Sequence, residues 1–213
     1  MKYLKKYKLF ENVNEQEIHY LCKKYGIENY TINTDGSIDV DGNVDLENKG
    51  LTKLPLRFKN VSGDFSCSYN QLTNLEGAPS EVGGSFQCYN NNLTSLEGAP
   101  SEVGGDFYCE DNNLTSLEWA PTSVGGDFYC EDNNLTSLDG LEFKSFREID
   151  LKDNPIYPIV KDWINRDDRE ELIEYFVDMR VIQGNKLIKE RLFAFYDEVD
   201  ILGLNDLKDY KVV

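Results

Sequence analysis

The stretch GGDFYCEDNNLTSLE occupies residues 104–118 and recurs at residues 125–139, where only the final Glu is replaced by Asp. Near-identical copies at a fixed spacing indicate a repeat architecture, in which one structural unit is stacked many times. The step from Phe107 to Phe128 is 21 residues. The sequence therefore predicts one elongated stack of coils for most of this chain of 213 residues.

The same step extends from these two copies in both directions and defines recurring columns. An apolar column, mostly phenylalanine, contains Val44, Phe65, Phe86, Phe107, Phe128 and Ile149. A cysteine column, with leucine at its ends, contains Leu46, Cys67, Cys88, Cys109, Cys130 and Leu151. An asparagine column contains Asn70, Asn91, Asn112, Asn133 and Asn154. Two leucine columns start at Leu51 and Leu54, so the repeat reads F-x-C-x-x-N-x-L-x-x-L.

Each column has a physical role in the predicted coil. Phe107 and Cys109 alternate with Tyr108, so a short strand buries the first two and exposes the tyrosine. Asn112 lies where the chain leaves the strand, and its amide is expected to join a ladder of hydrogen bonds between coils. The return segment EGAPSEVGG is too short and too rich in Gly and Pro for a full helix, so we expect it to be extended or polyproline-like, with a single turn at most.

The repeat resembles the leucine-rich repeat pattern L-x-L-x-x-N-x-L, at the short end of its length range. The unit L-T-S-L-E-G-A-P-S-E-V-G-G is similar to short leucine-rich repeats of bacterial proteins and of tailed phages with large genomes, and the tail after N-P-I-Y resembles the ending of such phage proteins. The resemblance implies a protein-binding scaffold. Related bacterial effectors often have a separate ubiquitin-ligase domain with a catalytic Cys, but residues 161–213 contain no Cys, so that activity is not implied.

Three regions follow from this pattern. Residues 1–42 are predicted to form an N-terminal cap, with a helix that starts at the capping box Asn14–Glu17 and short strands separated by Asp-Gly turns. Residues 43–160 form a leucine-rich repeat solenoid of about six 21-residue coils. Residues 161–213 form an α-helical C-terminal cap, in which Asp167 and Asp168 cap a helix and Gly184 ends that segment.

The charge distribution limits the classes of partner. The formal net charge is −17, and about −12 of it falls on residues 43–160. Between Lys59 and Lys144 there is no Lys or Arg. Such a surface repels nucleic acid and anionic lipid and favours a cationic partner. The alternative interpretation is that the acidity only keeps a repeat protein soluble.

The cysteines are predicted to be buried apolar residues of the core, although a thiolate metal site in the stacked column is geometrically conceivable. The motif D-x-D-G at residues 39–42 suggests calcium, but the remaining ligands of an EF-hand loop are missing. We therefore expect no metal and no cofactor. The charged start Met1-Lys-Tyr-Leu-Lys-Lys is unlike a signal peptide and no run is long enough for a membrane span, so we expect a cytoplasmic protein, in the host bacterium if phage-encoded.

The outward side chains of the predicted strands form the candidate binding surface. Three outward columns run through the coils, and nine of their eighteen positions are acidic whereas one is basic. Carboxylates pair with Lys and Arg, and tyrosine rings provide apolar area at low entropy cost. The predicted partner-binding residues are Asp64, Gln87, Tyr89, Asp106, Tyr108, Glu110, Asp127, Tyr129 and Glu131.

Other interpretations stay open at this point. Tandem duplication copies surface residues too, so the acidic columns are also explained without selection for binding. An acidic mimic of nucleic acid that blocks a DNA-binding protein is a variant of the scaffold hypothesis. An enzyme with its site in the C-terminal helices is the third possibility, although no catalytic motif stands out there and no catalytic residue is predicted. The Gly-Gly pairs lack the Lys-Ser/Thr of a phosphate-binding loop.

Overall fold

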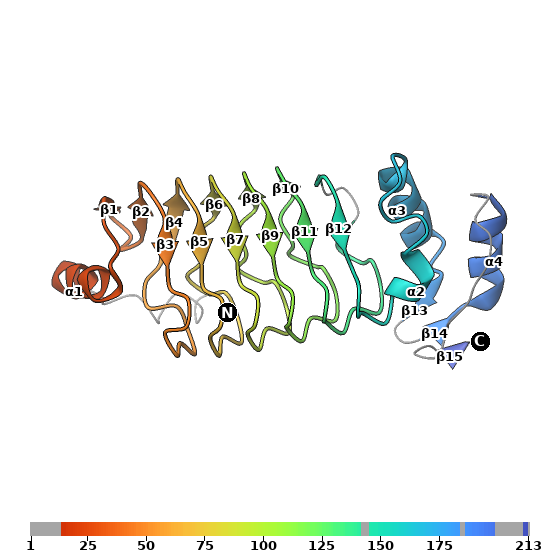
Figure 1. Ribbon diagram of the computed structural model, residues 1–213, viewed down its shortest axis with the longest axis horizontal. Coiled ribbons are helices and arrows are strands. Elements are labelled where there is room, and N and C mark those ends of the chain that lie inside the picture. Colours follow the sequence, from red (N-terminus) through yellow and green to blue (C-terminus); the bar gives the residue numbers. More distant parts are fainter. Residues whose placement is uncertain (1–13, 142–144, 184–185, 199–210, 213) are drawn as a thin grey trace, which may run out of the picture.

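The chain forms an elongated solenoid whose coils stack along the long axis, with one helix at the N-terminal end and further helices at the C-terminal end (Figure 1). This computed structural model describes residues 14–141, 145–183, 186–198 and 211–212. Two parallel sheets run along the solenoid, one on each side of a continuous core. The predicted repeat solenoid with short parallel strands and helical ends is confirmed.

The first sheet, called here the motif sheet, is built from the F-x-C segments. Its strands are β3 (Val44–Asp45), β5 (Phe65–Ser66), β7 (Phe86–Gln87), β9 (Phe107–Tyr108), β11 (Phe128–Tyr129) and β12 (Ile149–Asp150). Phe107 lies between Phe86 and Phe128 in the parallel register, so neighbouring coils align at the repeat period. Phenylalanines therefore face each other across the central strands, whereas the outward residues Ser66, Gln87 and Tyr108 differ.

The return segments form a second sheet, called here the return sheet. Its strands are β1 (Tyr30–Ile32), β2 (Ile38–Val40), β4 (Phe58–Val61), β6 (Glu81–Val82), β8 (Glu102–Val103) and β10 (Ser123–Val124). All of these pair in parallel except β1, which forms an antiparallel hairpin with β2. The return segments are extended, as predicted, but their pairing into a sheet was not anticipated.

The core lies between the two sheets and consists of the predicted apolar columns. The rings of Phe65, Phe86 and Phe107 stack with centroid separations of 5.5 Å, and all three side chains are fully buried. The five cysteines are buried free thiols. Burial raises the pKa of Cys67 to about 12, so this thiol is neutral at physiological pH. The structure thus places the cysteines as core residues, which was the favoured interpretation.

The asparagine ladder predicted from the sequence is present. The Asn112 amide nitrogen donates to the carbonyl oxygens of Cys88 (3.1 Å) and Cys109 (3.2 Å), and its Oδ1 accepts from the Leu93 N–H at 3.0 Å. One side chain therefore satisfies backbone groups of its own coil and of the preceding one. The same arrangement recurs at Asn70, Asn91, Asn133 and Asn154.

The Gly-Gly pairs are explained by the close approach of neighbouring coils. A Cβ atom placed on Gly104 would lie 2.2 Å from the carbonyl oxygen of Gly83, and one on Gly125 would lie 2.2 Å from that of Gly104. Backbone atoms cannot move aside without breaking the return sheet, so only glycine is accommodated there.

The N-terminal cap follows the sequence prediction closely. Helix α1 (Glu15–Tyr25) begins at Asn14, whose Oδ1 accepts from the Glu17 N–H at 2.9 Å, and it ends at Gly26 with φ of 68°. Ile18 and Cys22 are buried in the solenoid core, so α1 covers the open end of the stack.

The C-terminal cap contains helices α2 (Tyr157–Val160), α3 (Arg169–Asp178) and α4 (Lys189–Glu198). Trp163 is fully buried, and its ring lies 5.4 Å from that of Phe176 and 5.3 Å from that of Phe195. A three-stranded sheet of β13 (Ile182–Gln183), β14 (Lys186–Leu187) and β15 (Lys211–Val212) accompanies the helices and was not predicted.

The predicted start of the C-terminal helix is right in position, but its capping mechanism is wrong. Helix α3 starts directly after Asp168, yet the Asp168 side chain makes no capping hydrogen bond and instead accepts two bonds of 2.9 Å from Arg166. The helix ends at Asp178, and Gly184 lies outside the described residues.

Candidate binding face on the motif sheet

Four tyrosine rings form a continuous line across the outer surface of the motif sheet, called here the tyrosine ridge. Tyr69 and Tyr89 are 5.2 Å apart at their centroids, Tyr89 and Tyr108 are 6.5 Å apart, and Tyr108 and Tyr129 are 4.7 Å apart. The last pair is stacked with an interplanar angle of 5°. The structure thus brings together the three tyrosines that the sequence analysis singled out.

Tyr69 is a member of the ridge that the sequence analysis missed. It lies one residue after Ser68, the last outward position of its coil. The backbone has a positive φ in this column, and the value at Tyr69 is 53°. Asn48, Asn90 and Asp111 occupy the neighbouring positions of this column, and such residues favour that conformation. Tyrosine is unfavourable at a positive φ. Its presence in a column of Asn and Asp was therefore the sequence signal that could have identified Tyr69 as a candidate surface residue.

The stacked rings of Tyr108 and Tyr129 are held in place by their hydroxyl groups. The Tyr108 hydroxyl donates to Asp106 Oδ2 at 3.0 Å, and the Tyr129 hydroxyl donates to Asp127 Oδ2 at 3.3 Å. Burial, followed by this hydrogen bond, raises the pKa of Tyr108 to about 12. The rings therefore present a rigid apolar surface, which loses little conformational entropy on binding a partner.

The first outward column, which lies just before the motif-sheet strands, forms a structural ladder between coils and contains Asn43, Asp64, Ser85, Asp106, Asp127 and Glu148. At the first four positions of this column, the side-chain oxygen accepts from the backbone N–H one coil further along. Asp106 Oδ1 accepts from Asp127 at 2.8 Å, and Asp64 Oδ1 accepts from Ser85 at 2.8 Å. Asn43 Oδ1 likewise accepts from the Asp64 N–H at 2.9 Å, and Ser85 Oγ accepts from the Asp106 N–H at 3.1 Å. This ladder accounts for the presence of Asn, Asp or Ser, which are short side chains with an acceptor, at these positions.

Asp127 has a further partner within the chain. Arg147 donates to it through Nε at 2.8 Å and Nη2 at 2.7 Å, which is a bidentate ion pair. The hydrogen bond from Arg147 holds the pKa of Asp127 below its usual value. Of the predicted partner-binding aspartates, Asp64, Asp106 and Asp127 are thus all engaged in holding the solenoid together.

Glu110 and Glu131 differ from those aspartates, because each has a buried Oε2 atom that makes no hydrogen bond to any described residue. They occupy the same column of neighbouring coils, two residues after the ends of β9 and β11. Burial, together with the charge of Glu131, raises the pKa of Glu110 to about 7, and burial also raises the pKa of Glu131. An unsatisfied buried carboxylate is costly, so a cation supplied from outside would be stabilised here.

The remaining predicted residue, Gln87, lies half-buried on β7 beside the ridge. At the C-terminal end of the ridge a cavity of about 180 Å³ opens next to Tyr129. It is lined on one side by residues of β12 and on the other by Tyr157, Lys161 and Asn165 of the C-terminal cap. The cavity was not predicted from the sequence, because it forms between segments that are separated along the chain.

The aspartates of the calcium alternative have partners of their own. Asp39 accepts from the backbone and side chain of Asn60, and Asp41 Oδ1 accepts from the Ser62 hydroxyl at 2.9 Å. Within residues that the structure describes, no three His, Cys, Asp or Glu side chains are arranged to hold a metal ion. The same residues include no helix of the length and apolar character that crossing a membrane requires.

Comparison of the chain with protein-family models, curated proteins and solved structures finds no match in any of the three.

Proposed function

We propose that this protein is a non-enzymatic interaction scaffold that binds a basic protein through the tyrosine ridge and the neighbouring carboxylates. The observation behind the proposal is the ridge itself, a line of four tyrosine rings in mutual contact on the outer surface of the motif sheet. Aromatic side chains of this kind dominate the energetics of many protein interfaces.

The charges beside the ridge support a cationic partner. Asp106 and Asp127 are satisfied by contacts within the chain, but the Oε2 atoms of Glu110 and Glu131 are not satisfied by any described residue. A Lys or Arg side chain of the partner would pair with these two carboxylates while its stem packs on the faces of Tyr108 and Tyr129. The resemblance to short leucine-rich repeat proteins of bacteria and tailed phages supports a scaffold role in a bacterial cytoplasm.

The test uses capture of proteins from bacterial lysate on three forms of the full-length chain. The site variant combines Tyr108→Ser, Glu110→Gln and Glu131→Gln, which leaves the aspartate ladder intact. The matched control combines Glu76→Gln and Glu118→Gln, which removes the same charge outside the ridge. We expect the wild type and the control to retain a basic protein, and the site variant to retain at least about tenfold less, since loss of a hot spot costs about 2 kcal/mol or more.

The partner should also be released as the ionic strength rises, because exposed ion pairs are screened by salt. Circular dichroism and the unfolding midpoint would show whether the site variant is folded. Equal retention of the same partner by the folded site variant and the wild type would refute binding through the ridge.

A further inference from the structure

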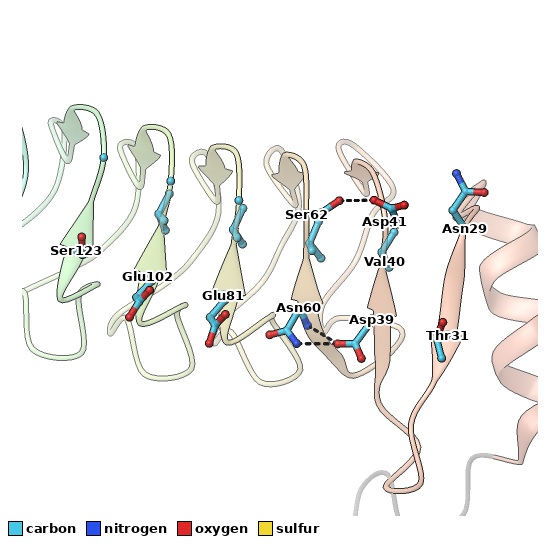
Figure 2. Close-up of a pocket in the computed structure, with 16 residues that line it drawn as sticks. Asn29, Thr31, Asp39, Val40, Asp41, Asn60, Ser62, Glu81, Glu102 and Ser123 are labelled. Atoms are coloured by element: carbon cyan, nitrogen blue, oxygen red, sulfur yellow. Dashed lines mark hydrogen bonds between the residues drawn. The ribbon is translucent and has the colours of Figure 1, made fainter.

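A second surface lies on the opposite side of the solenoid from the tyrosine ridge. A groove of about 610 Å³ runs over the outer surface of the return sheet and crosses its strands from β1 to β10. Figure 2 shows its labelled residues in successive strands, with Thr31 at one end and Ser123 at the other.

The shape of the groove follows from the repeat. Val40, Val61, Val82 and Val103 lie beneath it with their side chains buried in the core, while the exposed glycines Gly83, Gly104 and Gly125 line one side without side chains. These glycines are required by the close approach of the coils, and they leave space above the backbone.

The central part of the groove is acidic. Its lining includes Asp39, Asp41, Glu81 and Glu102, and none of its described lining residues is Lys or Arg. Asp39 and Asp41 accept hydrogen bonds from Asn60 and Ser62, which Figure 2 also shows. Glu81 and Glu102 are exposed, and no described Lys or Arg forms an ion pair with either. They face each other in the register of β6 and β8, where like charges repel, so a bound cation would be stabilising.

The chain itself contains a segment of complementary chemistry. Residues 1–13 read MKYLKKYKLFENV, with four lysines, one glutamate and six apolar or aromatic residues between Tyr3 and Val13. They lead directly into α1, which lies next to β1 at the end where the groove begins (Figure 1). Thirteen extended residues reach at most about 45 Å, whereas six strands spaced about 4.8 Å apart span about 24 Å.

We propose that residues 1–13 bind in the groove of the return sheet of the same chain, with their lysines paired to Glu81 and Glu102. This contact is separate from the tyrosine ridge, which faces the other way. It would leave the ridge open to a partner and cover the acidic groove, so a failure of one proposal does not affect the other.

Zero-length carbodiimide cross-linking of the full-length monomer, followed by peptide mass spectrometry, tests the proposal. We expect Lys2, Lys5, Lys6 and Lys8 to be joined mainly to Glu81, Glu102, Asp39 and Asp41 at low salt. Glu81→Gln should reduce the yield at the unchanged Glu102 by about threefold or more, because the segment is then held less tightly. The control Glu76→Gln should leave the yield at Glu102 unchanged.

Three results would overturn the proposal. Cross-links spread evenly over exposed carboxylates would show that the groove has no preference for the segment. Cross-links concentrated at Glu110 and Glu131 would place the segment on the tyrosine ridge. In an equimolar mixture of isotopically heavy and light protein, mixed heavy–light cross-links at the frequency of random pairing would show that the occupant comes from a second copy.

Discussion

At the scale of single residues, neighbouring copies of one repeat position have different roles according to their contacts. Asp106 and Glu110 are both outward acidic residues of the same coil. The former is satisfied by a backbone N–H and a tyrosine hydroxyl, whereas the latter has a buried oxygen that no described residue satisfies. Charge alone therefore does not identify the groups available to a partner. The number of hydrogen bonds that each carboxylate already accepts is the better guide.

Glu110 predicts a specific pH dependence of stability. Its pKa is about 7 in the folded chain, against an ordinary value of 4.5. The folded state therefore binds this proton more tightly than the unfolded state. Protonation of Glu110 stabilises the folded chain fully below the unfolded pKa, and this stabilisation is lost as the pH rises through about 7. Relative to Glu110→Gln, we expect the wild type to lose on the order of 1 kcal/mol of unfolding free energy between about pH 5 and about pH 8, allowing for partial solvent access.

Urea unfolding of both proteins at several pH values would measure this difference. The exposed Glu118→Gln variant serves as the control and should follow the wild-type profile. Superimposable pH profiles for the wild type and Glu110→Gln would show that Glu110 titrates as an ordinary exposed glutamate.

At the scale of the coil, most of the specificity of stacking comes from two ladders of side chains that bind the backbone. The asparagine ladder lies inside the stack, and the Asn, Asp and Ser ladder lies along the motif sheet. Strands of two residues make too few backbone hydrogen bonds to set their register alone. The ladders add bonds that form only when neighbouring coils are aligned at the repeat period.

The asparagine ladder can be tested at its centre. Asn112→Ala removes the groups that pair with the Leu93 N–H and the carbonyls of Cys88 and Cys109, and it leaves these buried backbone groups unsatisfied. We expect a loss of about 3 kcal/mol in unfolding free energy, measured by chemical denaturation. The neighbouring Asn113→Ala, at an exposed position, should change stability by less than about 0.5 kcal/mol. Equal stabilities of the two variants would rule out a structural role for the ladder.

At the scale of the whole molecule, a parallel solenoid is limited by its ends, because the last strand of each sheet has unpaired backbone groups and the core would be open to water. Helix α1 covers the N-terminal end with Ile18 and Cys22. The C-terminal end is followed by α2, α3 and α4 and by the buried ring of Trp163 (Figure 1). The two ends are thus closed by amphipathic elements of unrelated sequence.

Ile18→Asp tests the function of the N-terminal cap. A carboxylate in place of a fully buried side chain should release α1 from the core and expose the end of the stack. We expect concentration-dependent association, detected by light scattering after size-exclusion chromatography, and an unfolding free energy lower by at least about 3 kcal/mol. Tyr20→Asp, on the exposed side of the same helix, should stay as monodisperse as the wild type. A monodisperse Ile18→Asp with wild-type stability would contradict the capping role.

The sequence by itself determined the period, the buried columns, the asparagine ladder and the N-terminal helix with its caps. The period, the columns and the ladder depend on contacts between equivalent positions one period apart, so the repeated residues predict them. The helix and its caps depend on residues within a turn of each other, so the local sequence predicts them. Only the tertiary structure decided that the return segments pair into a second sheet and that Asp64, Asp106 and Asp127 are bound within the chain. The reason is geometric: whether an outward side chain meets the next coil, a distant arginine or open solvent depends on how closely the coils approach, and residue type does not specify that distance.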